Sequence, residues 1–184
     1  TLNRSTGILR EYGYLINKIA FPSWVLPLIP LASALLSQAI ILVLTFGLMV
    51  YDGVLPSPHI WIYLPVWALT LAVSIGLGYA IAAVAVYVHD VAQVVPVLIN
   101  IMFWLTPILY PATLVENSGL AWLRNLIMVF NPFYYLVEAS RLAWFGAADF
   151  PWSYLGVLGG FALLMLLAGA LVFRRLQPGF ADVI

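Results

Sequence analysis

Residues His89 to Pro132 read HDVAQVVPVLINIMFWLTPILYPATLVENSGLAWLRNLIMVFNP and are the most informative segment of the chain. It opens with a polar corner, His89-Asp90, and continues with twenty uncharged residues from Val91 to Tyr110. A helix needs about twenty such residues to cross the hydrocarbon core of a bilayer. Pro96 and Pro107 lie inside the run and remove helix hydrogen bonds, which a helix that moves or lines a cavity tolerates. The run therefore predicts a membrane span.

The composition of the whole chain agrees with this interpretation. Of 184 residues, 65% are hydrophobic and only 8% are charged, whereas soluble domains carry about 25% charged residues. The apolar runs do not alternate with polar residues, as barrel strands would. The fold class is thus an all-α integral membrane protein. The net charge of zero gives no reason to expect nucleic acid as a partner, and without cysteine there are no disulfides or thiolate metal sites.

Four transmembrane helices are expected, at residues 24–51, 60–88, 91–110 and 152–173. Small residues share one face of the second span, and the last span carries a GxxxG pair, so both faces predict close helix contacts. These small residues are Ser74, Gly78 and Ala82 in the second span, and Gly156 and Gly160 in the last. Because the first residue is Thr rather than Met, we expect further residues before Thr1.

Residues 1–22 differ from the rest of the chain because they combine charged residues with apolar residues that recur at helical spacing. The apolar stripe comprises Ile8, Leu9, Tyr12, Leu15, Ile16 and Ile19. This pattern predicts an amphipathic cytoplasmic helix, which Ser5 or Thr6 would cap. Such a helix can lie on the membrane surface, dock on a partner, or do both.

Residues 112–151 carry too many charges for a simple span, because a charge at mid-bilayer costs about 2.5–3.5 kcal/mol. The charged residues are Glu116, Arg124, Glu138, Arg141 and Asp149. Residues 120–130 would form a helix half a membrane long, at about 1.5 Å per residue. Asn131 then caps a second helix that starts at Pro132 and runs to about Phe145. Glu138 and Arg141, three residues apart, can pair. We expect a re-entrant helical hairpin covered by other helices.

The distribution of basic residues predicts the orientation. With four crossings, both ends and the His89-Asp90 corner share one side, where Arg4, Arg10, Lys18, Arg174 and Arg175 lie. The other side has only Arg124 and Arg141. Both ends of the chain are therefore expected in the cytoplasm, and the hairpin outside.

Several kinds of chemistry are absent from the sequence. The chain has no GxxxxGK[ST], HExxH or CxxC pattern, and no acidic residue falls at the centre of an expected span. Ion-coupled carriers usually need an ionisable group at that depth. A transporter of this composition would therefore take its energy from a separate subunit. We expect no metal and no cofactor in this chain.

Aromatic residues gather in and around the expected hairpin, and two interpretations stay open. The cluster comprises Phe103, Trp104, Phe130, Phe133, Tyr134, Tyr135 and Trp144. Flat amphipathic rings can stack on the apolar faces of sugars while their polar tips bond hydroxyl groups. Helix packing explains the same residues equally well.

Four segments together resemble the membrane subunit of bacterial polysaccharide ABC exporters, in the type 2 ABC permease superfamily. They are GYLINKIAFP at 13–22, YVHDV at 87–91, FWLTPILYP at 103–111, and NPF at 131–133 with Glu138 and Arg141. The resemblance covers essentially the whole chain. It implies six spans in the full protein, of which these would be the third to the sixth.

The resemblance also implies partners: a second copy, two ATPase subunits that hold ATP and Mg, membrane lipid, and a lipid-linked glycan such as O-antigen, teichoic acid or capsule. The implied location is the bacterial cytoplasmic (inner) membrane. The implied coupling residues are Leu9, Arg10, Tyr12, Leu15, Ile16 and Lys18, with His89 and Asp90 at the cytoplasmic corner. The family usually has Arg at the first corner position, and His is near neutral at pH 7.

The residues implied for the channel and gate are Phe103, Trp104, Tyr110, Phe130, Phe133, Tyr134, Tyr135, Glu138, Arg141 and Trp144. Two alternatives remain. One is a type 2 ABC permease for drugs or small lipids. The other is an intramembrane glycan polymerase or ligase, which would need a catalytic acid or base in a cavity. Only Glu138 and Arg141 are candidates for that role, and no catalytic residue is expected otherwise.

Overall fold

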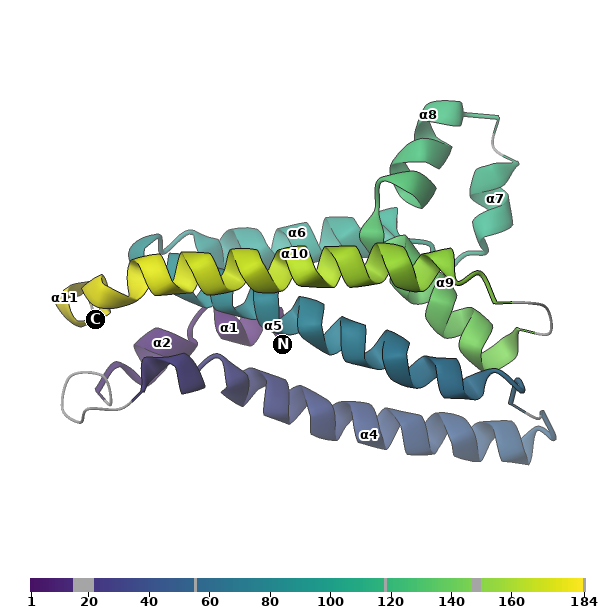
Figure 1. Cartoon of the computed structure of the whole chain (residues 1–184), viewed down its shortest axis with the longest axis horizontal. Helices are drawn as coiled ribbons and strands as arrows, with labels where there is room; N and C mark the ends of the chain where they lie inside the picture. Colours follow the sequence, from purple (N-terminus) through teal and green to yellow (C-terminus); the bar gives the residue numbers. More distant parts are fainter. Residues whose placement is uncertain (15–21, 55, 118, 147–149, 184) are drawn as a thin grey trace. The chain divides into compact units, whose positions relative to one another are not determined.

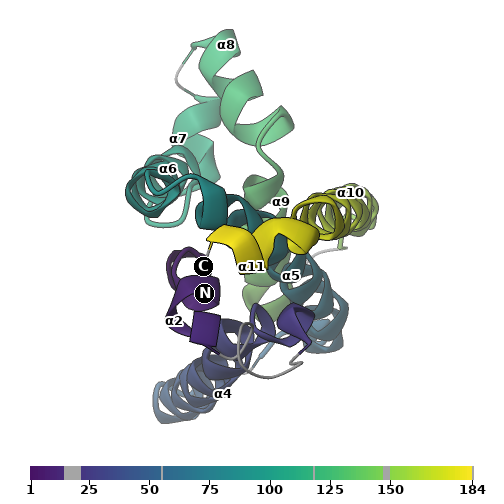
Figure 2. The same cartoon turned by 90° about the vertical axis from the view of Figure 1, so that its left-hand side faces the viewer.

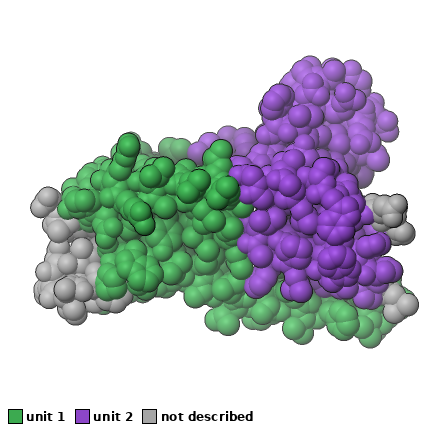
Figure 3. Space-filling model, viewed as in Figure 1, with its two compact units in different colours: residues 1–55, 71–96, 162–184 green, residues 56–70, 97–161 purple. Residues whose placement is uncertain are grey.

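The computed structural model describes residues 1–14, 22–54, 56–117, 119–146 and 150–183. The chain divides into two compact units, coloured separately in Figure 3. Unit 1 comprises residues 1–55, 71–96 and 162–184, and unit 2 comprises residues 56–70 and 97–161. Three helices, α5, α6 and α10, contribute residues to both units.

All regular secondary structure of the described residues is helical (Figure 1), which confirms the predicted class. The three long helices are α4 (Leu28–Tyr51), α5 (Tyr63–Tyr87) and α10 (Ser153–Leu176). With their flanking turns they give three stretches that are long and apolar enough to cross a membrane, Ser23–Tyr51, Ile60–Tyr87 and Ser153–Gly179. The shorter elements are α1 (Leu2–Ser5), α2 (Ile8–Glu11), η1 (Ser23–Val25), η2 (Ile60–Ile62), α6 (Val91–Leu105), α7 (Ala112–Glu116), α8 (Ala121–Arg124), η3 (Asn125–Val129), α9 (Pro132–Phe145), η4 (Gln177–Gly179) and α11 (Phe180–Val183).

The helix α6 ends at Leu105, whereas the sequence predicted one span to Tyr110. Its 15 residues measure about 22 Å at 1.5 Å per residue, less than the ~30 Å of hydrocarbon. Pro107 explains the early end, because proline disfavours helical geometry at Thr106 and has no amide hydrogen. The amide of Thr106 still bonds the carbonyl of Met102 at 2.9 Å, and turns and bends follow.

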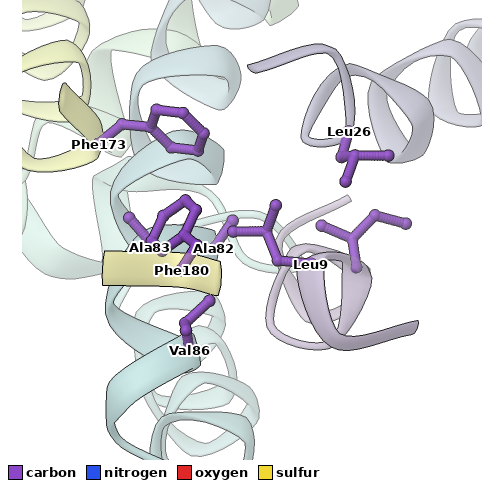
Figure 4. Close-up of a cluster of buried hydrophobic side chains, with 8 residues drawn as sticks. Leu9, Leu26, Ala82, Ala83, Val86, Phe173 and Phe180 are labelled. Carbon is purple, nitrogen blue, oxygen red and sulfur yellow. The ribbon is translucent and has the colours of Figure 1, made fainter. Parts of the chain in front are cut away.

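The core of unit 1 joins the N-terminal segment to the C-terminal end of the chain (Figure 4). Figure 2 faces the side that carries α2 and α11. The buried residues are Ile8 and Leu9 of α2, Leu26, then Ala82, Ala83 and Val86 of α5, Phe173 of α10 and Phe180 of α11. Full burial of one such large side chain contributes about 1.5–3 kcal/mol. The apolar face of α2 therefore packs on the chain itself.

The predicted cap of the N-terminal amphipathic helix, Ser5 or Thr6, is wrong. Helix α1 ends at Ser5, and α2 begins at Ile8 with Gly7 at its N-cap and no side-chain cap. The hydroxyl of Thr6 instead donates to the carbonyl of Asn3 at 2.8 Å. Gly7 favours a break between the two helices, because glycine loses more conformational entropy in a helix than other residues do. The part of the predicted stripe at residues 15–19 lies outside the described residues.

Helices α5 and α10 approach closely within unit 1 at Gly76 and Gly169. A Cβ on Gly76 would overlap the backbone of Met165 and Leu166, and one on Gly169 would overlap the backbone of Gly76. Only glycine permits this approach of two backbones. The glycines of the predicted GxxxG face make no such contact among the described residues, because a Cβ on Gly156 or Gly160 would meet nothing within 4 Å. Spacing alone did not identify the glycines in contact.

The core of unit 2 forms around α9, which confirms the predicted helix from Pro132 to Phe145. Ala139 and Ala143 of α9 pack with Ile62, Val66, Phe150 and Leu158. The amide of Ser57 donates to the carbonyl of Trp144 at 3.0 Å, and its hydroxyl donates to Gly146 at 2.6 Å. The helix predicted over residues 120–130 consists of α8 followed by the π-helical turn η3.

Candidate functional site

The candidate gate in unit 2 is organised by Asn131, the residue before α9. Its Oδ1 accepts the amide of Phe133 at 3.0 Å, which caps the helix as the sequence predicted. Its Nδ2 donates to the hydroxyl of Thr106 at 2.9 Å. Asn131 is 4% exposed and Thr106 is 2% exposed. One buried amide thus caps α9 and joins it to the residue that follows α6.

Arg141 makes the second connection between α9 and the chain after α6. Its Nη1 donates to Glu138 Oε2 at 2.9 Å, which confirms the predicted pair. Its Nη2 donates to the carbonyl of Pro107 at 3.0 Å. The carbonyl of Pro107 lies beyond the end of α6, where no helix amide is available to bond it. The guanidinium of Arg141 supplies that hydrogen bond instead. Arg141 therefore holds the geometry of this break.

Part of the predicted aromatic cluster is packed inside unit 2. Tyr134 is only 5% exposed, and its ring lies 5.4 Å from Tyr135 and 6.4 Å from Tyr154, both edge-on. Burial raises the pKa of Tyr134, and so does its hydrogen bond with Tyr154, so its hydroxyl stays neutral. Trp144 packs edge-on against Tyr63 at 5.4 Å. For these rings the structure shows packing, one of the two open interpretations.

The other part of the cluster is exposed. Trp104 is 65% exposed, Phe130 76% and Phe103 37%. Phe103 and Trp104 pack edge-on at 5.8 Å, and the hydroxyl of Tyr110 donates to the carbonyl of Trp104 at 3.3 Å. Phe133 is intermediate, with its ring edge-on to a ring of α10 at 5.8 Å. Exposed ring faces at the end of α6 are available for stacking on another molecule.

The candidate coupling region in unit 1 is fixed by Arg10. Its Nη2 donates to the carbonyl of Val86 at 2.8 Å, one residue before the end of α5. A cation there is stabilised by the negative end of the helix dipole. Leu9 is 1% exposed, and its buried side chain anchors the N-terminal segment in the core of unit 1. Tyr12 is partly buried against the same core. Leu15, Ile16 and Lys18, also predicted for coupling, lie outside the described residues.

The corner that the sequence assigns to the cytoplasm is exposed. His89 and Asp90 are both exposed and lie between α5 and α6. The carbonyl of Asp90 accepts the amides of Gln93 and Val94, each at 2.9 Å, and so starts α6.

Sequence reasoning missed several long-range bonds of these regions. The hydroxyl of Tyr87 donates to the carbonyl of Leu176 at 2.8 Å, and the side-chain Nε2 of Gln177 donates to the hydroxyl of Ser23 at 3.0 Å. No periodicity marks such pairs, because their members lie 89 and 154 residues apart. The bond of Thr106 to Asn131 was missed for the same reason.

No group of three His, Cys, Asp or Glu within the described part of the chain could hold a metal ion. Glu138, a candidate acid of the intramembrane-enzyme alternative, is engaged with Arg141. This contact agrees with the structural role predicted for the pair.

The apolar helices of span length define the class: a multi-pass, all-helical membrane protein. The chain belongs to the ABC-2 type transporter family, whose model matches residues 4–145. It is 25% identical over 170 residues to the O-antigen export system permease protein RfbA of Myxococcus xanthus, with 92% of this chain and 64% of that protein covered. The protein of the same name from Klebsiella pneumoniae is 25% identical over 176 residues, with the same coverage of 92% and 64%.

The chain thus spans 64% of the length of both relatives. Family membership confirms the resemblance seen in the sequence. It identifies a transporter component rather than a typical catalyst, and it agrees with a multi-pass location in the cytoplasmic membrane.

Proposed function

We propose that the chain is the channel-forming permease subunit of an ATP-driven exporter that moves a lipid-linked polysaccharide across the cytoplasmic membrane. The observation that carries the proposal is the similarity, over 92% of the chain, to two permeases named for O-antigen export. The polymer would be of the O-antigen, teichoic acid or capsule type. Two copies would form the channel, and two separate ATPase subunits would hold ATP and Mg.

The sequence supports a separate source of energy. It contains no phosphate-binding GxxxxGK[ST] loop, so the hydrolysis step falls to another subunit. The chain needs a surface that receives the motion of that subunit. The N-terminal segment is suited to this task because Arg10 is bonded to the end of α5 and Leu9 is buried in the core of unit 1. A displacement of this segment would therefore be transmitted directly to α5.

The exposed corner His89-Asp90 lies two and three residues beyond the end of α5. It adds a second surface that an ATPase could contact. The corner holds His89 where the family usually has Arg, so the proposed contact does not rest on an arginine.

The exposed aromatic rings support a glycan substrate. Trp104 and Phe130 expose most of their surface, and sugars offer apolar faces to such rings. The buried Tyr134 would hold the fold of unit 2 rather than touch the substrate. Trp104 and Tyr134, both predicted for the gate, would therefore have different roles.

The test measures export per protein molecule in cells that carry the full-length transporter. We expect Trp104→Ala to reduce export with unchanged protein abundance, because a stacking contact is worth about 0.5–1.5 kcal/mol beyond its area. Trp122→Ala is the matched control, since Trp122 is also 65% exposed but lies in α8 outside the cluster. Tyr134→Ala should instead lower abundance.

Equal export per molecule in Trp104→Ala and the wild type would remove the substrate role of this ring. Export of a small drug or lipid instead of a glycan would favour the permease alternative. Glycan transport or synthesis by the purified chain alone, without an ATPase subunit, would refute the proposal.

A further inference from the structure

A half-open groove lies in unit 1 between the turn η1, which precedes α4, and the C-terminal halves of α5 and α10. Its volume is about 380 Å³, within the ~300–1,000 Å³ of small-molecule sites. Ile75 of α5, and Leu166 and Ala170 of α10, line its apolar part. None of the predicted coupling or gate residues lines it.

Hydrogen bonds fix the walls of this groove. The hydroxyl of Tyr79 donates to the carbonyl of Trp24 at 2.6 Å, which joins α5 to the turn before α4. Gln177 donates to Ser23 at 3.0 Å and joins the end of α10 to the same turn. Trp24 and Gln177 also line the groove. The groove is thus formed by three segments that are bonded to one another.

A cation lines the groove. Arg174 is exposed and lines the groove near the end of α10. No ion pair joins it to a carboxylate of the described side chains. Its neighbour Arg175 is also exposed but does not line the groove. The apolar part therefore continues into a positively charged end.

This combination matches one kind of molecule. Arg174 and Arg175 belong to the end of the last span that the basic residues assign to the cytoplasm. The cytoplasmic leaflet is rich in anionic lipids, and basic pockets between helices on that side bind their headgroups. Trp24 is 53% exposed, and tryptophan prefers the headgroup level of a bilayer. The apolar walls would suit one acyl chain.

We propose that this groove binds one anionic glycerophospholipid of the cytoplasmic leaflet, with its phosphate on Arg174 and an acyl chain along Ile75, Leu166 and Ala170. The bound lipid fills the groove between the turn η1 and the α5–α10 pair. It is a component of the folded subunit rather than the transported molecule. The inference does not depend on which polymer is exported.

The test uses the full-length protein, purified and equilibrated with equal amounts of dioleoyl phosphatidylglycerol and dioleoyl phosphatidylcholine. Native mass spectrometry counts each lipid that is retained. We expect the wild type to retain phosphatidylglycerol preferentially. Arg174→Gln should reduce that retention about fivefold, the factor given by a lipid contact of about 1 kcal/mol. Arg175→Gln is the matched control and should stay within about twofold.

Two further variants keep the test decisive. Arg174→Lys retains the charge and should retain most of the preference. Ala170→Trp fills the groove and should displace phosphatidylglycerol and phosphatidylcholine alike. An equal loss in Arg174→Gln and Arg175→Gln would overturn the proposal, since it would show a general attraction to basic residues. Retention unchanged in Ala170→Trp would also overturn it, as would a photocrosslinker at Ala170 that reached only protein.

Discussion

The bond between Asn131 and Thr106 allows a quantitative prediction. Asn131→Ala removes the helix cap, worth about 1 kcal/mol, and leaves the buried hydroxyl of Thr106 without its donor, which costs about 1 kcal/mol or more. We expect a total loss of about 2 kcal/mol. Thr106→Val keeps the side-chain shape at position 106 and the Asn131 cap of α9, but it leaves Asn131 Nδ2 without an acceptor. It should lower the free energy of unfolding by about 1 kcal/mol. Asn131→Ser retains a cap and should resemble Thr106→Val.

The double variant separates the bond from the cap. If the two side chains bond each other, Asn131→Ala with Thr106→Val should cost about 2 kcal/mol, because the second change removes a group whose partner is already gone. Independent effects would instead add to about 3 kcal/mol. The coupling energy is therefore about 1 kcal/mol, inside the range of side-chain bonds measured between membrane helices, which average about 0.6 kcal/mol.

The assay is reversible unfolding of the purified full-length protein in mixed micelles, followed by tryptophan fluorescence. The chain contains seven tryptophans, so the signal is large. A coupling energy indistinguishable from zero would refute the bond and the view that α9 is fixed to the end of α6. Thr106→Ser retains the hydroxyl and is the control, expected to lose only the contribution of one methyl group, about 0.8 kcal/mol.

Two further predictions concern unit 1. Gly169→Ala would place a Cβ into the backbone of α5. We therefore expect a sharp drop in the monodisperse fraction of the purified protein on size-exclusion chromatography. Gly159→Ala is the control and should behave as the wild type, because a Cβ there meets nothing within 4 Å. Arg10→Gln removes the bond to the carbonyl of Val86 and should lower transport-coupled ATP hydrolysis of the proposed transporter complex with little change in expression. Arg4→Gln is its control, since Arg4 is exposed, and equal losses in both variants would contradict the coupling role.

Patterns in the sequence were sufficient for the class, the long helices and the start of α9. A span is recognised by comparing a run of apolar residues with the thickness of a bilayer, and both are properties of a single segment. The cap at Asn131 and the pair Glu138–Arg141 are local for the same reason, because their members lie within three residues of each other. These predictions are confirmed.

Contacts between residues far apart in the sequence became visible only in the folded chain. The glycines in contact are Gly76 and Gly169 rather than a GxxxG pair, because the facing backbone determines where a Cβ is excluded. The partner of Arg10 is a helix carbonyl 76 positions away. The aromatic residues, alike in the sequence, separate into a packed and an exposed set. Local patterns determine which segments enter the membrane, and packing between distant segments determines which groups remain free for a substrate, a lipid or a partner.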